Sequence, residues 1–204
     1  MPNENTNGIN VNAANVAIDL NGFAIQGPVT CTGKGSTLVC APPGTGEGIY
    51  SNTAVTTFVH GGSVSGMGDS GIDLSEDSRV QNVSVTYNGS DGVYLASGII
   101  SNVTAASNYG HGIAIGTGVV DHVSSKWNFM DGIYNGYSVA VMDSFSGGNK
   151  GFGLSGGFLK SVYRGSAFID NVAGPTGGGP LLNGGGNLCD SGASFTVRES
   201  VGNL

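Results

Sequence analysis

The chain repeats a short motif with a period of about 20 residues. A glycine followed by an apolar residue opens each repeat, in the segments GIDL, GVYL, GIAI, GIYN and GLSG at Gly71, Gly92, Gly112, Gly132 and Gly153. Four residues before each glycine lies a second column, which is mostly asparagine: Met67, Asn88, Asn108, Asn128 and Asn149, continued by Asn171. Several columns that keep one register favour a solenoid in which each repeat forms one coil.

The residues within each repeat predict strands rather than helices. Short apolar runs with period-2 alternation are separated by Gly, Asn and Ser, which is typical of short strands joined by tight turns. One coil cannot bury its own apolar face, but coils stacked at the ~4.8 Å strand spacing bury a continuous column of Ile, Val and Leu. We therefore predict an all-β parallel β-helix with coils of about 20 residues. The glycines fit turns with positive φ or close backbone approach, and the asparagines fit an internal amide ladder.

A single domain over residues 1–204 accounts for this length and pattern. Residues 28–47 interrupt the repeat and are expected to form a cysteine-containing loop insertion. Residues 174–204 are expected to form a Gly-rich loop followed by a capping strand. Because residues 8–11 already resemble a coil strand, we expect a further strand or cap upstream. No apolar run reaches the ~18 residues of a membrane span, and the first residues do not resemble a secretion signal.

The three cysteines differ in their settings. Cys31 and Cys40 are separated by eight residues, which is enough for a local disulfide and would imply an oxidising compartment. The alternative is two reduced thiols in a loop. Cys189 is left without a partner in this assignment and could pair outside the chain.

The net charge of −7 bears on the choice of partner. Seven Lys and Arg residues scattered along the chain provide no basic stretch for phosphates, which disfavours nucleic acid as a partner. The same charge disfavours a polyanionic sugar unless a cation such as Ca²⁺ bridges the two. A neutral glycan is the better match, and no other cofactor is expected.

Two columns of side chains are candidate sites. In GVYL the apolar residues should face the core, so the residue between them should face outward. The outward column that results offers sugar-stacking rings and a carboxylate: Tyr50, Asp73, Tyr94 and Tyr134. The alternative is that tyrosine is simply a good strand residue.

The second column immediately precedes the glycines and contains Asp91, His111 and Asp131. One coil apart, these groups could support acid–base chemistry with His111 as the proton shuttle. Asp91 and Asp131 could instead hold Ca²⁺. The alternative is turn chemistry, since Asp-Gly is a common turn pair. A weaker candidate column, beside another turn, contains Asn82, Asn102, His122 and Asp143.

Together these features resemble the right-handed parallel β-helix superfamily with the pectate-lyase-like fold, over residues 8–172. The stretch NVAIDLNGFAIQGPVTC at residues 15–31 looks like the opening of secreted bacterial β-helix-repeat proteins. The resemblance implies a right-handed solenoid in a secreted protein, extracellular or periplasmic.

The segment GHG around His111 is similar to that of polygalacturonase-type hydrolases, and Asp91 matches the second Asp of that family's pair. Ser70 and Ser90, however, stand where the family has aspartates, so its acid–base pair is not assembled at those positions.

Two functions remain as expectations. The first is a secreted module that binds or processes a carbohydrate polymer along its outer face; an enzyme of this kind would be a polysaccharide lyase or a glycoside hydrolase. The second is a non-catalytic structural or adhesive solenoid, which could assemble as a trimer through its flat faces. The same coil hosts both kinds of protein, so the fold alone does not choose between them.

Overall fold

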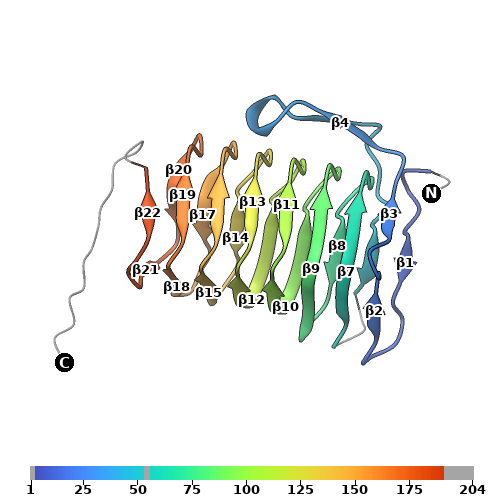
Figure 1. Cartoon of the computed structure of the whole chain (residues 1–204), viewed down its shortest axis with the longest axis horizontal. Helices are drawn as coiled ribbons and strands as arrows, with labels where there is room; N and C mark the ends of the chain where they lie inside the picture. Colours follow the sequence, from blue (N-terminus) through green and yellow to red (C-terminus); the bar gives the residue numbers. More distant parts are fainter. Residues whose placement is uncertain (1–2, 53–55, 191–204) are drawn as a thin grey trace.

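The chain winds into a parallel β-solenoid of about seven turns (Figure 1). The computed structural model describes residues 3–52 and 56–190. Each coil contributes three short strand segments, and every segment pairs in parallel with the equivalent segment of the next coil. The predicted all-β parallel fold and the repeat length are confirmed. The part of the chain described here contains no helix with the length and apolar character that crossing a membrane requires.

Three stacks of strands form the solenoid, and each stack is called a face below. Face 1 contains β1 (Ile9–Asn10), β6 (Ile49–Ser51), β8 (Ile72–Leu74), the first halves of β10 (Val93–Ser101) and β12 (Ile113–Asp121), β14 (Ile133–Asn135), β17 (Phe152–Gly156) and β20 (Gly174–Gly178). Face 2 contains β2 (Ala17–Asp19), the first halves of β7 (Phe58–Ser65) and β9 (Ser78–Thr86), the second halves of β10 and β12, β15 (Val139–Met142), β18 (Ser161–Arg164) and β21 (Leu181–Asn183). Face 3 contains β3 (Ala24–Gln26), the second halves of β7 and β9, β11 (Thr104–Ala106), β13 (Ser124–Lys126), β16 (Phe145–Gly147), β19 (Ala167–Ile169) and β22 (Leu188–Cys189).

The core is a continuous apolar column inside these faces. On face 1 the strand register stacks five fully buried side chains: Ile72, Val93, Ile113, Ile133 and Leu154. On face 2 the inward column is equally buried: Val59, Val80, Ile100, Val120 and Val141. Each coil therefore covers the apolar side chains of its neighbour, as stacking in a solenoid requires.

The asparagine column forms the predicted ladder at the turn from face 3 to face 1. Asn88 Nδ2 donates to Asn108 Oδ1 at 2.9 Å, and Asn108 Nδ2 donates to Asn128 Oδ1 at 3.2 Å. The same Oδ1 atoms also accept the backbone N–H of the preceding asparagine. All three side chains are fully buried, so the ladder satisfies polar groups that have no access to water.

The glycine column next to the ladder is explained by close packing. None of the five glycines has a positive φ. A Cβ added to Gly112 would overlap the Ser125 hydroxyl and lie 2.5 Å from Asn128 Nδ2. Of the two reasons expected for these glycines, close approach is therefore the one that applies.

Residues 28–47, expected to form a loop, contain an antiparallel hairpin. Its strands are β4 (Thr30–Thr32) and β5 (Val39–Ala41), with the short 3₁₀ helix η1 (Gly35–Thr37) at the tip. The predicted Cys31–Cys40 disulfide joins the two strands. The hairpin extends along the solenoid (Figure 1), and its Gly35 N–H donates to the Trp127 carbonyl at 2.8 Å. Cys189 is a free, half-buried thiol.

Residues 174–190 differ from the expected Gly-rich loop. They form β20, β21 and β22, which add another coil to all three faces. Their glycines lie where side chains would not fit: a Cβ at Gly177 would overlap the Phe152 ring, and one at Gly179 would overlap the Gly157 carbonyl. Close stacking explains a composition that in isolation predicts a loop. The expected capping strand lies outside the described residues.

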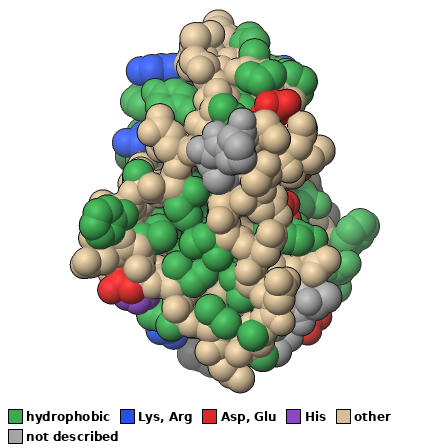
Figure 2. All heavy atoms as spheres, turned by 90° about the vertical axis from the view of Figure 1, so that its right-hand side faces the viewer, with side chains coloured by type: hydrophobic (Ala, Val, Ile, Leu, Met, Phe, Trp, Pro, Cys, Tyr) green, Lys and Arg blue, Asp and Glu red, His purple; other side chains and the backbone are tan. Residues whose placement is uncertain are grey.

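The N-terminal end of the solenoid is apolar at its centre. Figure 2 looks onto this end and shows hydrophobic side chains across the middle of the face. The inward residues of the first coil pack against the core but are only partly buried: Ile9, Val16, Ile18 and Ile25. Within the described residues, no coil stacks on their outer side.

Candidate functional site

The outward column of face 1 lies where the sequence predicts it. The strand register places Tyr50 beside Asp73, Asp73 beside Tyr94, and Ala114 between Tyr94 and Tyr134. The Tyr94 side chain is 40% exposed, whereas Asp73 and the other two tyrosines are half-buried. The four predicted binding residues therefore share one surface that runs along the solenoid.

The three predicted catalytic residues also lie in one column, at the turn that leads into face 1. Asp91 Oδ1 accepts the His111 backbone N–H at 2.7 Å, and His111 Nδ1 accepts the Asp131 backbone N–H at 3.2 Å. His111 Nδ1 is also 3.4 Å from Asp131 Oδ2. The structure thus brings the three side chains together, and each of them accepts a backbone N–H of the next coil.

Hydrogen bonding fixes the orientation of His111. Because Nδ1 accepts a backbone N–H, the neutral ring carries its proton on Nε2. The ring also stacks on Tyr134, with centroids 4.8 Å apart and an interplanar angle of 21°. His111 therefore connects the turn column to the outward tyrosine column.

Asp131 is the most constrained of the three. Its Oδ1 accepts the Phe152 backbone N–H at 2.7 Å, and its Oδ2 accepts the Ser155 hydroxyl at 2.6 Å. A carboxylate engaged on both oxygens is a poor candidate for a free base. Only one oxygen of Asp91, Oδ1, accepts a hydrogen bond among the described contacts. Burial raises the pKa of Asp91, and the attraction of His111 offsets this only in part.

Glu47 was not predicted from the sequence. It extends the column of Asp91, His111 and Asp131 by two coils. It aligns with Ser70, which in turn aligns with Asp91. Its side chain is hydrogen-bonded to Asp73, and only 9% of the residue is exposed. Burial, followed by the charge of Asp73, raises the pKa of Glu47 to about 8. Burial also raises the pKa of Asp73 to about 6.

This carboxyl pair can hold a proton at neutral pH. Between the two pKa values Glu47 is protonated while Asp73 is ionised, so an acid lies beside its acceptor. Because the two side chains are hydrogen-bonded, they are closer than the ~5 Å or more that separates the carboxylates of glycoside hydrolases across a scissile bond. The pair therefore does not flank a bond by itself.

The pair predicts a contribution to stability that is present at low pH and lost by pH 8. The folded-state pKa of Glu47 lies above its ordinary value of 4.5, so the folded protein binds this proton more tightly than the unfolded chain does. The contribution is fully present below pH 4.5 and is lost as the pH rises to about 8; Asp73 adds to it between 3.8 and about 6. Urea unfolding of the wild type and Glu47→Gln at several pH values measures this, and the variant should lose most of the slope between pH 6 and 8. An equal slope in both proteins would contradict the assignment.

An aromatic groove of about 190 Å³ opens on face 1 beside His111. Four rings line it, Tyr94, Tyr134, Tyr137 and Phe158, over a floor that includes Gly116 and Gly136. The Tyr137 and Phe158 rings are 6.1 Å apart, and the two side chains are 52% and 81% exposed. Both lie five residues after a glycine of the repeat, Gly132 or Gly153, but the column is aromatic only in these two coils, so no repeated residue type marks it.

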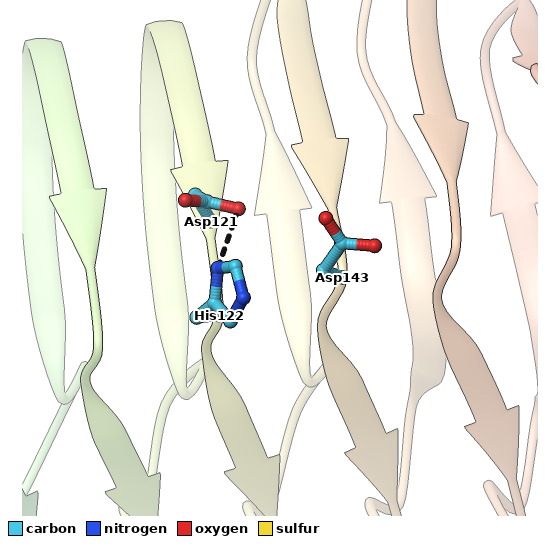
Figure 3. A group of neighbouring side chains, drawn as sticks. All are labelled: Asp121, His122 and Asp143. Carbon is cyan, nitrogen blue, oxygen red and sulfur yellow. Dashed lines mark ion pairs between the residues drawn. The ribbon is translucent and has the colours of Figure 1, made fainter.

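A separate group of side chains could hold a metal ion. Asp121, His122 and Asp143 have ligand atoms within 4.8 Å of one another, and Asp121 Oδ1 is 2.9 Å from His122 Nδ1 (Figure 3). His122 and Asp143 have the left-handed backbone of the turn from face 2 to face 3, with φ of 52° and 47°. Imidazole with carboxylates suits a transition metal better than Ca²⁺. In the described part of the chain this is the one group of three or more such ligands with this geometry, and neither Asp91 nor Asp131 belongs to it.

The fold and the site together define a parallel β-solenoid with a row of carboxyl and imidazole groups beside an aromatic groove. Comparisons with known protein families, curated proteins and solved structures give no match.

Proposed function

We propose that face 1 binds a neutral polysaccharide, with the aromatic groove as the principal contact. The observation that carries this proposal is the juxtaposition of four aromatic rings with hydrogen-bonding groups, among them His111 stacked on Tyr134. Pyranose rings have apolar faces that pack on aromatic rings, and their hydroxyls need polar partners at the rim. The outward column also runs along the axis, so successive coils present repeated contacts to a linear polymer.

We further propose that the protein chemically processes the glycan that it binds. His111 can offer Nε2–H, and Asp91, one coil away, provides a partly free carboxylate. These two groups support general acid–base catalysis beside the groove, as in a lyase or hydrolase with a pectate-lyase-like fold. Release of reducing ends from the bound glycan is the measurement that separates processing from binding.

The disulfide supports placing this activity outside the cytoplasm. Cys31 and Cys40 are bonded at the base of the hairpin, and such bonds persist in oxidising compartments. We therefore include secretion in the proposal.

Tyr94→Ala should weaken glycan binding about tenfold, because stacking on an exposed aromatic ring contributes about 1 kcal/mol or more. A glycan array should first identify the neutral ligand, and calorimetric titration then gives the Kd for each variant. Tyr109→Ala is the matched control, since Tyr109 is 39% exposed, close to the 40% of Tyr94, but lies outside the groove. If the two variants bind equally well, or if no neutral glycan binds, the proposal is wrong.

A non-catalytic structural or adhesive solenoid is the second candidate, and one observation favours it. Asp91, His111 and Asp131 each accept a backbone N–H of the following coil, which is a scaffold role. In that case no glycan is bound or cleaved, and analytical ultracentrifugation should show an assembly such as a trimer. Stability, rather than binding, would then respond to changes in these residues.

A further inference from the structure

Three lysines that are far apart in sequence gather on the edge of the solenoid between faces 3 and 1. Lys34 comes from the hairpin, Lys126 from the end of β13, and Lys150 from a turn one coil further on. The Nζ atoms of Lys34 and Lys126 lie 4.2 Å and 5.6 Å from the centroid of the Trp127 ring. Lys150 Nζ lies 3.6 Å from the Phe129 ring centroid. The chain has only four lysines, so most of them lie on this edge.

Aromatic rings form the surface between these lysines. Tyr109 and Phe129 stack with centroids 4.5 Å apart and an interplanar angle of 15°. Trp127 and Tyr109 are each 39% exposed. The Trp127 ring lies against Gly148, where a Cβ would come within 2.5 Å of its Cδ1 atom. We call the three lysines with Tyr109, Trp127 and Phe129 the lysine patch.

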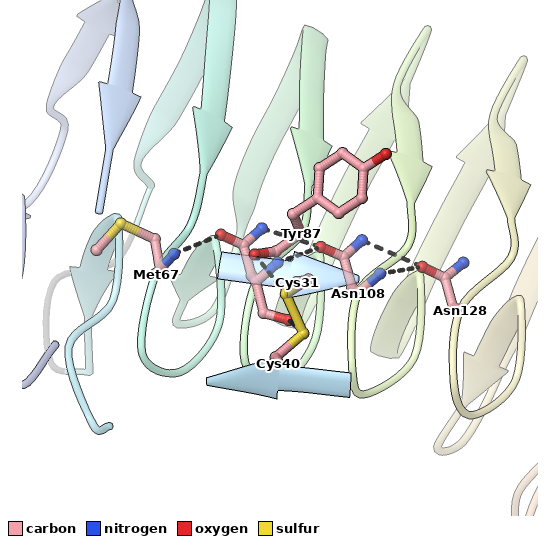
Figure 4. The surroundings of a disulfide bond; sticks show 7 residues. Cys31, Cys40, Met67, Tyr87, Asn108 and Asn128 are labelled. Carbon is pink, nitrogen blue, oxygen red and sulfur yellow. Dashed lines mark hydrogen bonds between the residues drawn. A yellow bond between two sulfur atoms is a disulfide. The ribbon is translucent and has the colours of Figure 1, made fainter. Parts of the chain in front are cut away.

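The patch continues into a cavity of about 710 Å³ under the hairpin. Lys34 lines this cavity as well as contacting Trp127, so the two features adjoin. Tyr87 and polar side chains such as Thr30 and Thr37 form other parts of its wall. Figure 4 shows Tyr87 beside Cys31 and the asparagine ladder, where the hairpin strands pass over the coils. The volume is within the ~300–1,000 Å³ of sites for small ligands.

The lysines of the patch are not neutralised by carboxylates. Within residues 3–52 and 56–190, every ion pair involves a histidine, and none involves Lys34, Lys126 or Lys150. Although the chain carries a net charge of −7, this edge presents ammonium groups and aromatic rings together. Scattered positions in the sequence thus become a local positive surface in the fold.

We propose that the lysine patch binds an anionic oligosaccharide, at a site separate from the groove on face 1. The ammonium groups provide charge partners for sulfate or carboxylate substituents. The exposed parts of Trp127 and Tyr109 provide apolar surface for the sugar rings, and the cavity beside Lys34 accommodates an additional unit. This inference does not depend on the proposed function of face 1, since it uses different residues and a ligand of different charge.

Trp127 reports directly on this site, because it is the only tryptophan of the chain. Its fluorescence should be titrated with three size-matched tetrasaccharides, one sulfated, one uronic-acid and one neutral, and with a short single-stranded oligonucleotide. At least one of the two anionic sugars should change the emission, with a Kd that rises with salt. Comparing the Kd of the sulfated sugar with that of the uronic-acid sugar identifies the anionic group that is recognised. The neutral sugar should cause no change.

The double variant Lys34→Gln with Lys150→Gln should weaken binding of the anionic sugar about tenfold or more, because two charged partners are removed. Lys160→Gln is the charge-matched control and should bind as the wild type does. Tyr94→Ala should also leave this affinity unchanged, which separates the site from the groove on face 1. Binding that is equal in the double variant and the wild type overturns the proposal. So does an absence of binding, equal binding of the neutral sugar, or equal binding of the oligonucleotide, the last of which would indicate a general anion surface.

Discussion

Asn108→Ala lowers the free energy of unfolding by about 3 kcal/mol, because two buried donors lose their acceptor. Asn88 donates to Asn108 Oδ1 through its side-chain amide at 2.9 Å and through its backbone N–H at 3.2 Å. The Val85 carbonyl also loses its bond from Asn108 Nδ2. None of these groups can form a replacement hydrogen bond with water, since Asn88 and Val85 are fully buried. Urea unfolding followed by far-UV circular dichroism gives the difference.

The control for this change is Thr104→Ala on the same coil. The Thr104 side chain is exposed on face 3, so its removal should alter stability by less than about 0.5 kcal/mol. Equal stability of the two variants would mean that water reaches the ladder and replaces the lost acceptor.

Gly112→Ala should also cost about 3 kcal/mol, through overpacking rather than lost hydrogen bonds. The new methyl group would overlap the Ser125 hydroxyl and lie 2.8 Å from the Gly132 carbonyl. The Ser125 hydroxyl cannot simply move away, because it donates to that carbonyl at 2.6 Å and accepts from Asn128 Nδ2 at 3.1 Å. Thermal and urea unfolding both report the loss of stability.

Gly136→Ala provides the comparison, because a Cβ at Gly136 would meet its nearest neighbour at 3.4 Å, an ordinary contact. This variant should remain within about 0.5 kcal/mol of the wild type. If both glycine variants are equally stable, the inference that the glycine column is too tightly packed for a side chain is wrong.

Periodicity identifies what every coil repeats. The asparagine ladder, the buried columns and the outward tyrosines occupy equivalent places in successive coils, so their spacing in the sequence becomes stacking in the fold. Composition is less informative, because a glycine can mark either a loop or a tight contact. The run of glycines at residues 177–179 illustrates this, since it lies in and beside β20 rather than in a loop.

The site was only partly predictable for the same reason. Glu47 is the last residue of the insertion at residues 28–47. The interval from Gly48 to Gly71 is 23 residues, longer than the 20 or 21 residues between the later glycines. Extending the glycine column one coil backward would have found Glu47. Phe158 has an aromatic equivalent only in Tyr137 of the preceding coil, so the sequence shows no longer aromatic column. Lys34 reaches Trp127 only because the hairpin extends along the turns between faces 3 and 1.

The hairpin also changes how the solenoid should unfold. In a simple solenoid each coil contacts only its neighbours, so coils can fray one at a time from either end. Here the disulfide-linked hairpin emerges after β3 and is hydrogen-bonded to Trp127, which follows β13. The hairpin, closed by its disulfide, spans the coils between these two points. Opening any one of these coils therefore requires the hairpin to detach. The first half of the molecule should therefore open as one cooperative unit, while the last coils remain free to fray individually.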